Sequence, residues 1–245
     1  MKRIFSSLAV LSLCLCLGGI AQAKSYINGI DANYPPFGYV GEDGKPSGFD
    51  VEAMTWIANK MGFEIVHQPM DWDGIIPALL AKKIDMVCSG MSITPTRQEQ
   101  VNFSNPYWTL KKVFIVKTDS SLSMEQIMEG TYRVGVQRGT SEHEHLEKMV
   151  EAGAKFELRF YDSSPMAIED LLNGRLDAVG LDSPPAEDAI RRGKSVKIVG
   201  VFVEGDQFGV AIRKEDTDLL NTVNEGYKLL LADPYWEELQ AKFLQ

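Results

Sequence analysis

The amino-acid sequence predicts an α/β protein built from two similar lobes. Patterns typical of helices alternate with patterns typical of strands along the chain, which is the order found in α/β folds. Residues 79–87 also return in similar form at 171–179, each time as a helix end, a basic turn and a strand. Two copies are too few for a solenoid, so we interpret them as one unit in each lobe, with chance similarity as the alternative. Open α/β sheets bind ligands where strands end at helix N-termini, which predicts a ligand site between the lobes.

The spacing of apolar residues predicts the individual elements. Residues 49–61 place apolar side chains three and four positions apart and are followed by Gly62, which predicts an amphipathic helix with a C-terminal stop. Asp73 is positioned to cap a second helix that carries Ile75 and Leu79. Short apolar runs predict strands at 63–66, 84–87, 113–116, 132–136 and 156–160, and longer periodic runs predict further helices at 142–150, 219–231 and 235–243.

Residues 1–23 have the three regions of a secretory signal peptide. A basic start is followed by an apolar stretch at 8–17 and by a small-x-small cleavage site at 21–23. The apolar stretch is short for a permanent membrane helix, and Leu precedes both Cys14 and Cys16, which disfavours a lipid anchor. We therefore expect export to the periplasm and exclude these residues from the fold.

The remaining 222 residues carry a large negative charge. Two of the 25 Lys and Arg residues lie in the first 23 positions, which leaves 23 basic against 34 acidic residues and a formal charge of −11. Such a surface repels nucleic acid and anionic lipid, and it suits a soluble protein that diffuses outside the cytoplasm. Of the three cysteines only Cys88 remains, so no disulfide within the monomer is expected.

Residues 89–100 predict a receptor for an anion. Pro95 fits the first helical position with Thr94 as its N-cap, which puts Arg97 into the first turn. The helix dipole disfavours a cation there by about 0.3 to 1 kcal/mol, and a bound carboxylate or phosphate would remove this conflict. The alternative is that Arg97 pairs with Glu99 or extends into water.

The second lobe offers groups for both charges of a ligand. Thr140 or Ser141 follows a predicted strand and is placed to cap the next helix, whose N–H groups would then point at the cleft. Asp182 precedes Ser183 and two prolines, and because Ser183 can cap the helix that follows, Asp182 is free to bind a cation. The alternatives are an ordinary cap and a solvated carboxylate. Arg97 in one lobe and Asp182 in the other match the two charges of a zwitterionic amino acid.

Two aromatic side chains are candidates to flank a ligand. Tyr34 follows Asp31 in a Pro-rich loop, and Trp72 lies between two aspartates just before a helix. Both rings are therefore presented by loops, where they could enclose the side chain of a ligand. Packing in the core is the alternative.

With these features the chain resembles the periplasmic polar amino-acid binding proteins of ABC uptake transporters, solute-binding protein family 3. This family includes glutamine, histidine and lysine/arginine/ornithine binding proteins. The resemblance covers nearly all of the chain after residue 23 and rests on several short motifs together. They are Tyr34-Pro35-Pro36-Phe37, Gly48-Phe49-Asp50, residues 72–80, Ile93-Thr94-Pro95-x-Arg97, Phe103-Ser104-x-Pro106-Tyr107, Gly139-Thr140 and residues 174–178.

The resemblance implies the two-lobed periplasmic-binding-protein fold of type II, in which two α/β lobes are joined by two hinge strands and close on the ligand. It implies a first lobe at 24–111 that returns at 209–245, with the second lobe inserted at 112–208. It also implies a monomer that binds a free amino acid, delivers it to the membrane permease of an ABC transporter and uses no cofactor or metal.

The resemblance further implies which residues bind the ligand. They are Asp31, Tyr34, Trp72, Ser89, Gly90, Ser92, Arg97, Gln137, Thr140, Ser141 and Asp182. Arg97 would bind the α-carboxylate and Asp182 the α-ammonium, with hydroxyl and backbone contacts from the serines and Gly90. The aromatic pair would flank the ligand side chain, which Asp31 and Gln137 would reach from the two lobes. Because burial of a second carboxylate beside Asp31 would be costly, we expect polar uncharged or basic amino acids to be preferred over aspartate and glutamate.

Two other functions fit the same fold. Cyclohexadienyl dehydratases resemble it and use a carboxylic acid in the cleft as proton donor, whereas here an ammonium partner would keep Asp182 at that position ionised. A sensor domain that feeds a receptor would have the same binding chemistry. His143 and His145 lie two apart on a helix and cannot share a metal, and the sequence has no nucleophile elbow, P-loop or dinucleotide fingerprint. We therefore expect a binding protein rather than an enzyme.

Overall fold

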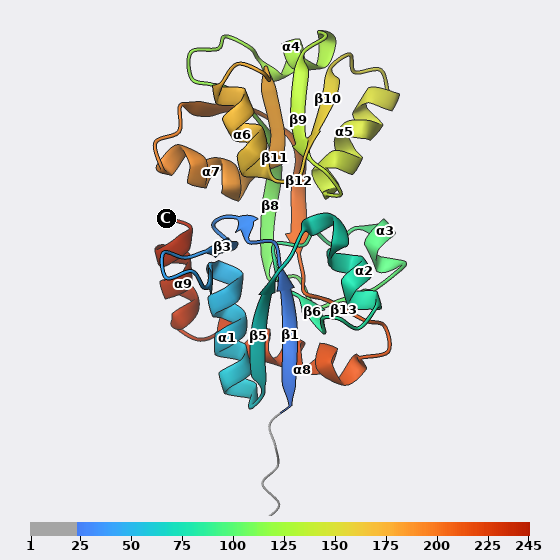
Figure 1. Ribbon diagram of the computed structural model, residues 1–245, viewed down its shortest axis with the longest axis vertical. Helices are drawn as coiled ribbons and strands as arrows, with labels where there is room; N and C mark the ends of the chain where they lie inside the picture. Colours follow the sequence, from blue (N-terminus) through green and yellow to red (C-terminus); the bar gives the residue numbers. More distant parts are fainter. Residues whose placement is uncertain (1–23) are drawn as a thin grey trace, which may run out of the picture.

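The structure, a computed structural model, describes residues 24–245, and the predicted signal peptide at 1–23 lies outside the described residues. Two lobes, each built on a five-stranded sheet, lie one above the other (Figure 1). The predicted α/β class and the two-lobed architecture are confirmed. Among the described residues, no helix combines the length and the apolar character needed to cross a membrane.

The first lobe holds the sheet of strand order β5-β1-β6-β13-β7. These strands are β1 (Ser25–Ile30), β5 (Glu64–Pro69), β6 (Met86–Val87), β7 (Asn102–Phe103) and β13 (Ala211–Ile212). A small sheet beside it consists of β2 (Asn33–Tyr34), β3 (Gly38–Val40) and β4 (Pro46–Ser47). The helices of this lobe are α1 (Phe49–Met61), α2 (Ile75–Leu80), α3 (Pro95–Gln98), α8 (Thr217–Leu231) and α9 (Tyr235–Phe243).

Helix α1 shows how the sequence pattern produces the core of this lobe. Its apolar side chains at Val51, Met54 and Ile57 are buried, and the helix packs against α8 and α9. It ends at Gly62 as predicted, because this residue has a φ of 76°, the left-handed conformation that glycine adopts at little cost.

The second lobe holds the sheet of strand order β10-β9-β11-β8-β12. These strands are β8 (Trp108–Lys117), β9 (Arg133–Gln137), β10 (Glu157–Tyr161), β11 (Ala178–Asp182) and β12 (Val196–Phe208). The helices are α4 (Met124–Glu129), α5 (Ser141–Glu151), α6 (Ser164–Leu172) and α7 (Ser183–Arg191). Separate apolar clusters form on the two faces of the sheet, so β11 in its centre is buried at every residue.

Two long antiparallel strands, β8 and β12, connect the lobes (Figure 1). They pair from Lys117 with Val196 down to Trp108 with Phe208, with three shifts of register between. The last shift lies between Val203 and Asp206. The lobe limits implied by the resemblance stay a prediction.

Several predicted elements have other limits in the structure, and the strand predicted at 113–116 differs most, because β8 extends from Trp108 to Lys117. Two further differences have a local cause. Asp73 caps no helix, because the Gly74 N–H donates to the Asp71 carbonyl (3.2 Å) and closes a 3-10 turn, η1 (Trp72–Gly74), that continues directly into α2. The strand predicted at 84–87 begins only at Met86. The turn before it extends further because Asp85 bonds to β1 through its side chain as well as its backbone.

Candidate ligand-binding site

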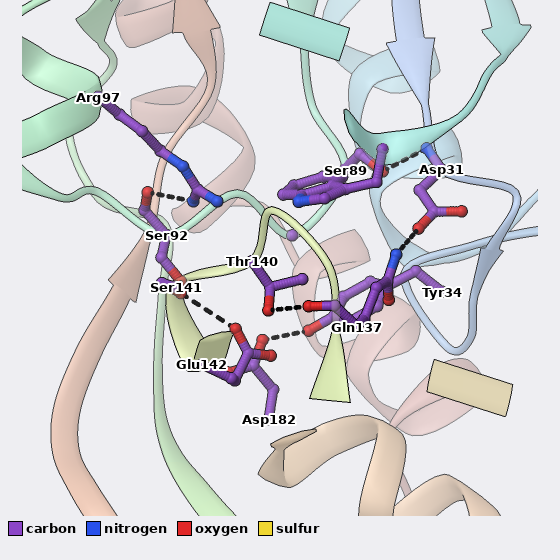
Figure 2. Close-up of a pocket in the computed structure, with 12 residues that line it drawn as sticks. Asp31, Tyr34, Ser89, Ser92, Arg97, Gln137, Thr140, Ser141, Glu142 and Asp182 are labelled. Carbon is purple, nitrogen blue, oxygen red and sulfur yellow. Dashed lines mark hydrogen bonds between the residues drawn. The ribbon is translucent and has the colours of Figure 1, made fainter. Parts of the chain in front are cut away.

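A narrow cavity lies between the two lobes. Its lining residues are Asp31, Tyr34, Trp72, Ser89, Gly90, Ser92, Arg97, Gln137, Thr140, Ser141, Glu142 and Asp182 (Figure 2). The structure thus brings together all eleven predicted site residues and adds Glu142. The cavity volume is about 10 Å³, which is about the space that one water molecule needs. We call this cavity the closed cleft, because side chains of the two lobes bond across it.

Arg97 is a buried cation bonded only to uncharged groups. The Thr94 hydroxyl caps α3 as predicted and accepts from the Arg97 N–H (3.2 Å). The Arg97 side chain donates from Nη1 to the Ser92 carbonyl (2.9 Å) and from Nη2 to the Gly139 carbonyl (3.2 Å), and the residue is 5% exposed. No carboxylate within residues 24–245 forms an ion pair with it. The alternative interpretation, in which Arg97 pairs with Glu99 or extends into water, is wrong.

The guanidinium of Arg97 has the properties of a carboxylate receptor. Burial lowers its pKa below the usual value, and nearby carboxylates, with Glu142 foremost, act in the opposite direction. Arginine has so high a pKa that it stays charged. Two of its five N–H donors are used by the two carbonyls, which leaves three for an anion. The ring of Trp72 lies 5.4 Å from the guanidinium carbon, within the range of a cation–π contact.

The first turn of α5 faces the closed cleft from the second lobe. Thr140, not Ser141, caps this helix: its hydroxyl accepts from the His143 N–H (3.2 Å) and donates to the Gln137 carbonyl (2.8 Å). Ser141 is the first helical residue, and its hydroxyl donates to the Ser92 hydroxyl of the first lobe (2.9 Å). The N–H groups at a helix start have no partner within the helix, so this end of α5 can bind an anion.

Asp182 ends β11 beside the start of α7, but it is neither a capping residue nor a solvated one. It is 2% exposed and makes no capping bond. Lys112 Nζ donates to Asp182 Oδ1 (2.7 Å), and the Tyr34 hydroxyl donates to Oδ2 (2.5 Å). The prediction that Ser183 caps α7 is wrong, because Ser183 already lies inside the helix. Asp182 makes no capping bond, as predicted, and in this structure its carboxylate is bonded to the cation Lys112.

Three further charged residues lie in this region and were not predicted as site residues: Lys112, Glu142 and Asp206. The Lys112 side chain is fully buried, and its Nζ lies 2.7 Å from Asp182, 2.8 Å from Asp206 and 3.4 Å from Glu142. The sequence gives no signal for this burial, because a lysine is rarely buried unless it is paired and the partners of Lys112 are distant in the chain. Glu142 and Asp206 carry no such signal either, because an acidic residue at a helix start or in a polar strand end is usually solvated.

Asp182, Glu142 and Lys112 itself have shifted pKa values. Burial, together with the neighbouring Glu142 carboxylate, raises the pKa of Asp182 to about 7. Burial also acts to raise the pKa of Glu142, but the Lys112 ammonium and the hydrogen bonds to this carboxylate together outweigh burial, so the pKa is lowered. Burial acts to lower the pKa of Lys112, and the carboxylates reverse this effect and raise it. Near pH 7, Asp182 and Glu142 therefore titrate as a pair.

Asp31 and Gln137 meet across the cleft, at its other end. Gln137 Nε2 donates to Asp31 Oδ2 (2.8 Å), and Gln137 Oε1 accepts from the N–H and the hydroxyl of Ser164 (3.1 and 2.9 Å). The Asn33 N–H donates to Asp31 Oδ1 (2.9 Å), and the Ser89 hydroxyl accepts from the Asp31 N–H (2.9 Å). Burial raises the pKa of Asp31, against the effect of its hydrogen bonds. No cation is bonded to this carboxylate among the described residues.

The two aromatic residues of the cleft differ in their surroundings. The Tyr34 ring is 7% exposed and packs against Phe208 (6.4 Å between centroids), so it belongs to the core while its hydroxyl reaches the cleft. Trp72 is half-buried, and its indole N–H donates to the Gly139 carbonyl of the second lobe (3.0 Å). Gly90 permits the approach of Tyr34, because a Cβ at this position would lie 2.4 Å from Tyr34 Cε1 and its φ is 58°.

Two α/β lobes, two connecting strands and a polar cleft between the lobes define the class of periplasmic binding proteins. The sequence pattern of the bacterial extracellular solute-binding proteins, family 3, matches residues 26–245. The chain belongs to this family, as the resemblance implied.

Individual relatives cover most of the chain. The L-cystine-binding protein TcyJ of Escherichia coli (strain K12) is 30% identical over 230 residues, which are 93% of this chain and 85% of that protein. An ancestral arginine-binding protein bound to arginine has a TM-score of 0.83 and 35% identity, over 90% of this chain and 98% of that one. An ancestral amino-acid-binding protein, described as a precursor of cyclohexadienyl dehydratase, has a TM-score of 0.83 and 33% identity, over 90% of this chain and 96% of that one.

Proposed function

We propose that this chain binds a free amino acid outside the cytoplasm and delivers it to the permease of an ABC transporter. The observation that carries the proposal is the buried guanidinium of Arg97, which has no acidic partner among residues 24–245, opposite the buried carboxylates of Asp182 and Glu142 in one closed cleft. A cation on one wall and anions on the other are complementary to the carboxylate and ammonium of an amino acid.

Each lobe supplies one half of the receptor. Arg97 and the N–H of Ser141 bind the α-carboxylate, and Asp182 binds the α-ammonium. Tyr34 and Trp72 flank the side chain of the ligand. The present bonds across the cleft, such as Tyr34 to Asp182 (2.5 Å), leave little room, so the lobes must open to admit the ligand and its polar groups then replace these bonds. Binding and hinge closure are therefore one event.

The charges of the cleft favour a basic amino acid. The buried acidic groups are Asp31, Glu142, Asp182 and Asp206, against Arg97 and Lys112 as the cations. An excess of buried negative charge is costly unless a cation compensates it. A ligand with a positively charged side chain does so beside Asp31, whereas a second carboxylate there adds to the excess. The likeness to an ancestral protein bound to arginine supports this preference for basic over acidic amino acids.

The family and the first 23 residues support a location outside the cytoplasm. The name of the family describes its members as extracellular, and the basic, apolar and small residues of the first 23 positions have the order of a signal peptide. We expect a monomer in the periplasm, because one chain supplies both walls of the cleft.

A dehydratase that acts through Asp182 is the second candidate. The observation that favours it is the pKa of about 7 for this carboxyl group, a value that suits a proton donor at neutral pH. Against it, both oxygens of Asp182 are held by Lys112 and Tyr34, and an ammonium ligand would ionise the group. Incubation with prephenate or arogenate, followed by the absorbance of the product, separates an enzyme from a binding protein.

A ligand screen on refolded protein tests the proposed function. The mature chain is unfolded and refolded to remove any amino acid that was purified with it, and its thermal unfolding is then measured with each common amino acid. A ligand at a hundred times its dissociation constant adds about 2.7 kcal/mol of stability. We expect the largest shifts with basic amino acids and none with glutamate. Refolded protein that is stabilised by no amino acid would contradict the proposal.

A further inference from the structure

Lys112 joins three carboxylates that come from different parts of the chain. Lys112 and Asp206 lie on the connecting strands β8 and β12, Glu142 lies in the first turn of α5, and Asp182 ends β11. The side-chain exposures are 0% for Lys112, 5% for Glu142, 3% for Asp182 and 9% for Asp206. One buried ammonium thus faces three buried carboxylates, and Lys112 alone does not neutralise them.

Glu142 differs from the other acidic partners of Lys112 in its position and in its bonds. It lines the closed cleft together with Asp182, whereas Asp206 does not. Both oxygens of Asp182 are bonded, to Lys112 and Tyr34. The Glu142 contacts with Lys112 Nζ (3.4 Å) and with the Ser141 hydroxyl (3.1 Å) both end at the same oxygen, Oε2, and the single proton of that hydroxyl is shared with the nearer Ser92 (2.9 Å). The carboxylate of Glu142 therefore has capacity for a further donor from the cleft.

We propose that Glu142 and Asp182 together receive the ammonium group of the ligand, with Lys112 holding the two carboxylates beside each other. This inference rests on the proposed function and adds a second residue to its ammonium site. Two carboxylates stabilise a buried cation better than one, and the ammonium of the ligand compensates charge that Lys112 leaves unbalanced. The amine thereby contributes to selection: a ligand without it leaves the pair without a counterion.

When no ligand is bound, a proton compensates the charge that the ligand amine would otherwise compensate. Near pH 7 the Glu142 and Asp182 pair holds part of a proton, since the pKa of Asp182 is about 7. The other charged or titratable groups around the pair are Lys112, Asp206, Arg97 and the Tyr34 hydroxyl. A bound ammonium favours the ionised form of both carboxylates, so binding releases this proton. Below pH 7 the affinity falls with decreasing pH, by up to about tenfold per unit for one proton.

Two ligands and two variants test the inference. The probes are L-arginine and 5-guanidinopentanoate, which is arginine without its α-amino group. Calorimetry on wild-type protein should give much tighter binding for L-arginine. In Glu142→Gln we expect at least a tenfold loss of affinity for L-arginine and less than a threefold loss for 5-guanidinopentanoate. Asp206→Asn is the matched control, because it removes the same charge from the same lysine at a residue that does not itself line the cleft, and an asparagine side chain can still accept from the Ser92 hydroxyl. Its ratio of the two affinities should stay within threefold of the wild-type ratio.

The number of protons released on binding is a second measurement. A purely structural role of Glu142 would not change this number. The binding enthalpy of L-arginine at pH 7 is measured in phosphate and in Tris, whose ionisation enthalpies differ. We expect a buffer-dependent enthalpy for wild type and Asp206→Asn and a much smaller dependence for Glu142→Gln. Equal losses for both ligands in Glu142→Gln, or an unchanged affinity for L-arginine, would overturn the inference while amino-acid binding by the wild type stands. Wild-type protein that binds no amino acid would overturn both the inference and the proposed function.

Discussion

The two lobes contain the same helix–turn–strand unit, and the aspartate of this unit makes the same contacts in both. In the first lobe the Asp85 N–H donates to the Ile27 carbonyl (2.8 Å), and Asp85 Oδ2 accepts from the Ile27 N–H (2.9 Å). In the second lobe Asp177 makes the same two bonds with Arg133 (2.9 and 2.8 Å). Each aspartate thus fixes its strand against a parallel neighbour, β1 or β9. The repeated sequence pattern is one structural unit used twice, and chance similarity does not explain it.

The two units differ in the residues that come after the strand. After β6 the chain continues with small residues to Gly90, whose N–H donates to the buried carboxylate of Asp50 (2.6 Å). After β11 comes Asp182, which Lys112 holds from the side (2.7 Å). Directly after the repeated strand, the first lobe therefore offers a close-fitting backbone segment, and the second lobe offers a carboxylate. The shared unit fixes where these segments lie, and the residues after each strand decide their chemistry.

The largest effect should come from the buried carboxylate behind the wall of the first lobe. Burial raises the pKa of Asp50 to about 7, above the value of about 3.9 for an unfolded aspartate. The folded state thus binds a proton that the unfolded state has released, and stability should fall as the pH rises from about 4 to about 7. One such group contributes up to roughly 4 kcal/mol over this window. Asp182, with the same direction of shift, adds a similar slope from the second lobe.

Urea unfolding of Asp50→Asn at pH 5, 6, 7 and 8 measures this contribution. Between pH 5 and pH 7, we expect the stability of the variant to fall by only about half as much as that of the wild type. Asp119→Asn, at an exposed carboxylate, serves as the control and should keep the full slope. If the pH dependence of stability is unchanged in Asp50→Asn, the pKa of Asp50 is not raised by burial in the first lobe, and this prediction is contradicted.

A second prediction tests whether the repeated aspartates are equivalent. Asp85→Ala and Asp177→Ala each leave a backbone N–H of the neighbouring strand without its acceptor and remove one ion pair of an arginine. Unsatisfied donors of this kind cost about 1 to 3 kcal/mol. We expect both variants to lose stability by amounts that agree within about 1 kcal/mol in denaturant unfolding. Asp43→Ala, in an exposed turn, should change little. A large loss in one lobe and none in the other would refute the equivalence.

The smallest effect concerns the turn inside the unit, where the two lobes have different residues. Lys82 has a φ of 59° and Gly174 a φ of 75°, a region that costs a residue with a side chain about 1 to 2 kcal/mol. Gly174→Ala should therefore destabilise by about 1 kcal/mol, and since a Cβ there meets nothing within 4 Å, the loss is due to the backbone alone. Lys82→Gly should be neutral or slightly stabilising, because relief of strain offsets the greater freedom of the unfolded glycine.

Gly74→Ala is the matched control for the turn. It also places a Cβ in open space, but its φ is −91°, so we expect a gain of about 0.4 to 1 kcal/mol. Thermal or urea unfolding of the variants measures these differences. A loss in Gly74→Ala as large as that in Gly174→Ala would mean that backbone conformation does not set the cost.

Much of the fold could be predicted because local signals and overall topology agree. The helices at 49–61 and 235–243 have the predicted limits, since each combines an apolar face with a clear stop or start. The prediction for Asp73 failed because a capping residue needs an extended backbone before the helix, and here the backbone before α2 forms a 3-10 turn. The cap position of α7 was predicted one residue too late, because the extended backbone before this helix is at Asp182, with ψ of 150°, and Ser183 is already helical.

Most of the cleft could be predicted because its residues come directly after strands or begin helices. Lys112 and Asp206 could not be placed from sequence, because their approach depends on how β8 and β12 pair across three shifts of register. The direction of their side chains is set by this long-range pairing and not by any local pattern. Glu142 could not be predicted because its burial depends on a long-range contact with Lys112 of β8.

The most direct test of the proposed receptor is the affinity of Arg97→Ala for L-arginine, measured by calorimetry on refolded protein. A charge-assisted bond to a carboxylate contributes about 1.5 to 3 kcal/mol, so we expect at least a tenfold loss, with a thermal unfolding temperature close to that of the wild type. Arg159→Ala, at an exposed arginine, should bind as the wild type does. If wild-type protein binds L-arginine and Arg97→Ala binds it within threefold of the same affinity, Arg97 is not the carboxylate receptor and the proposed binding mode is contradicted.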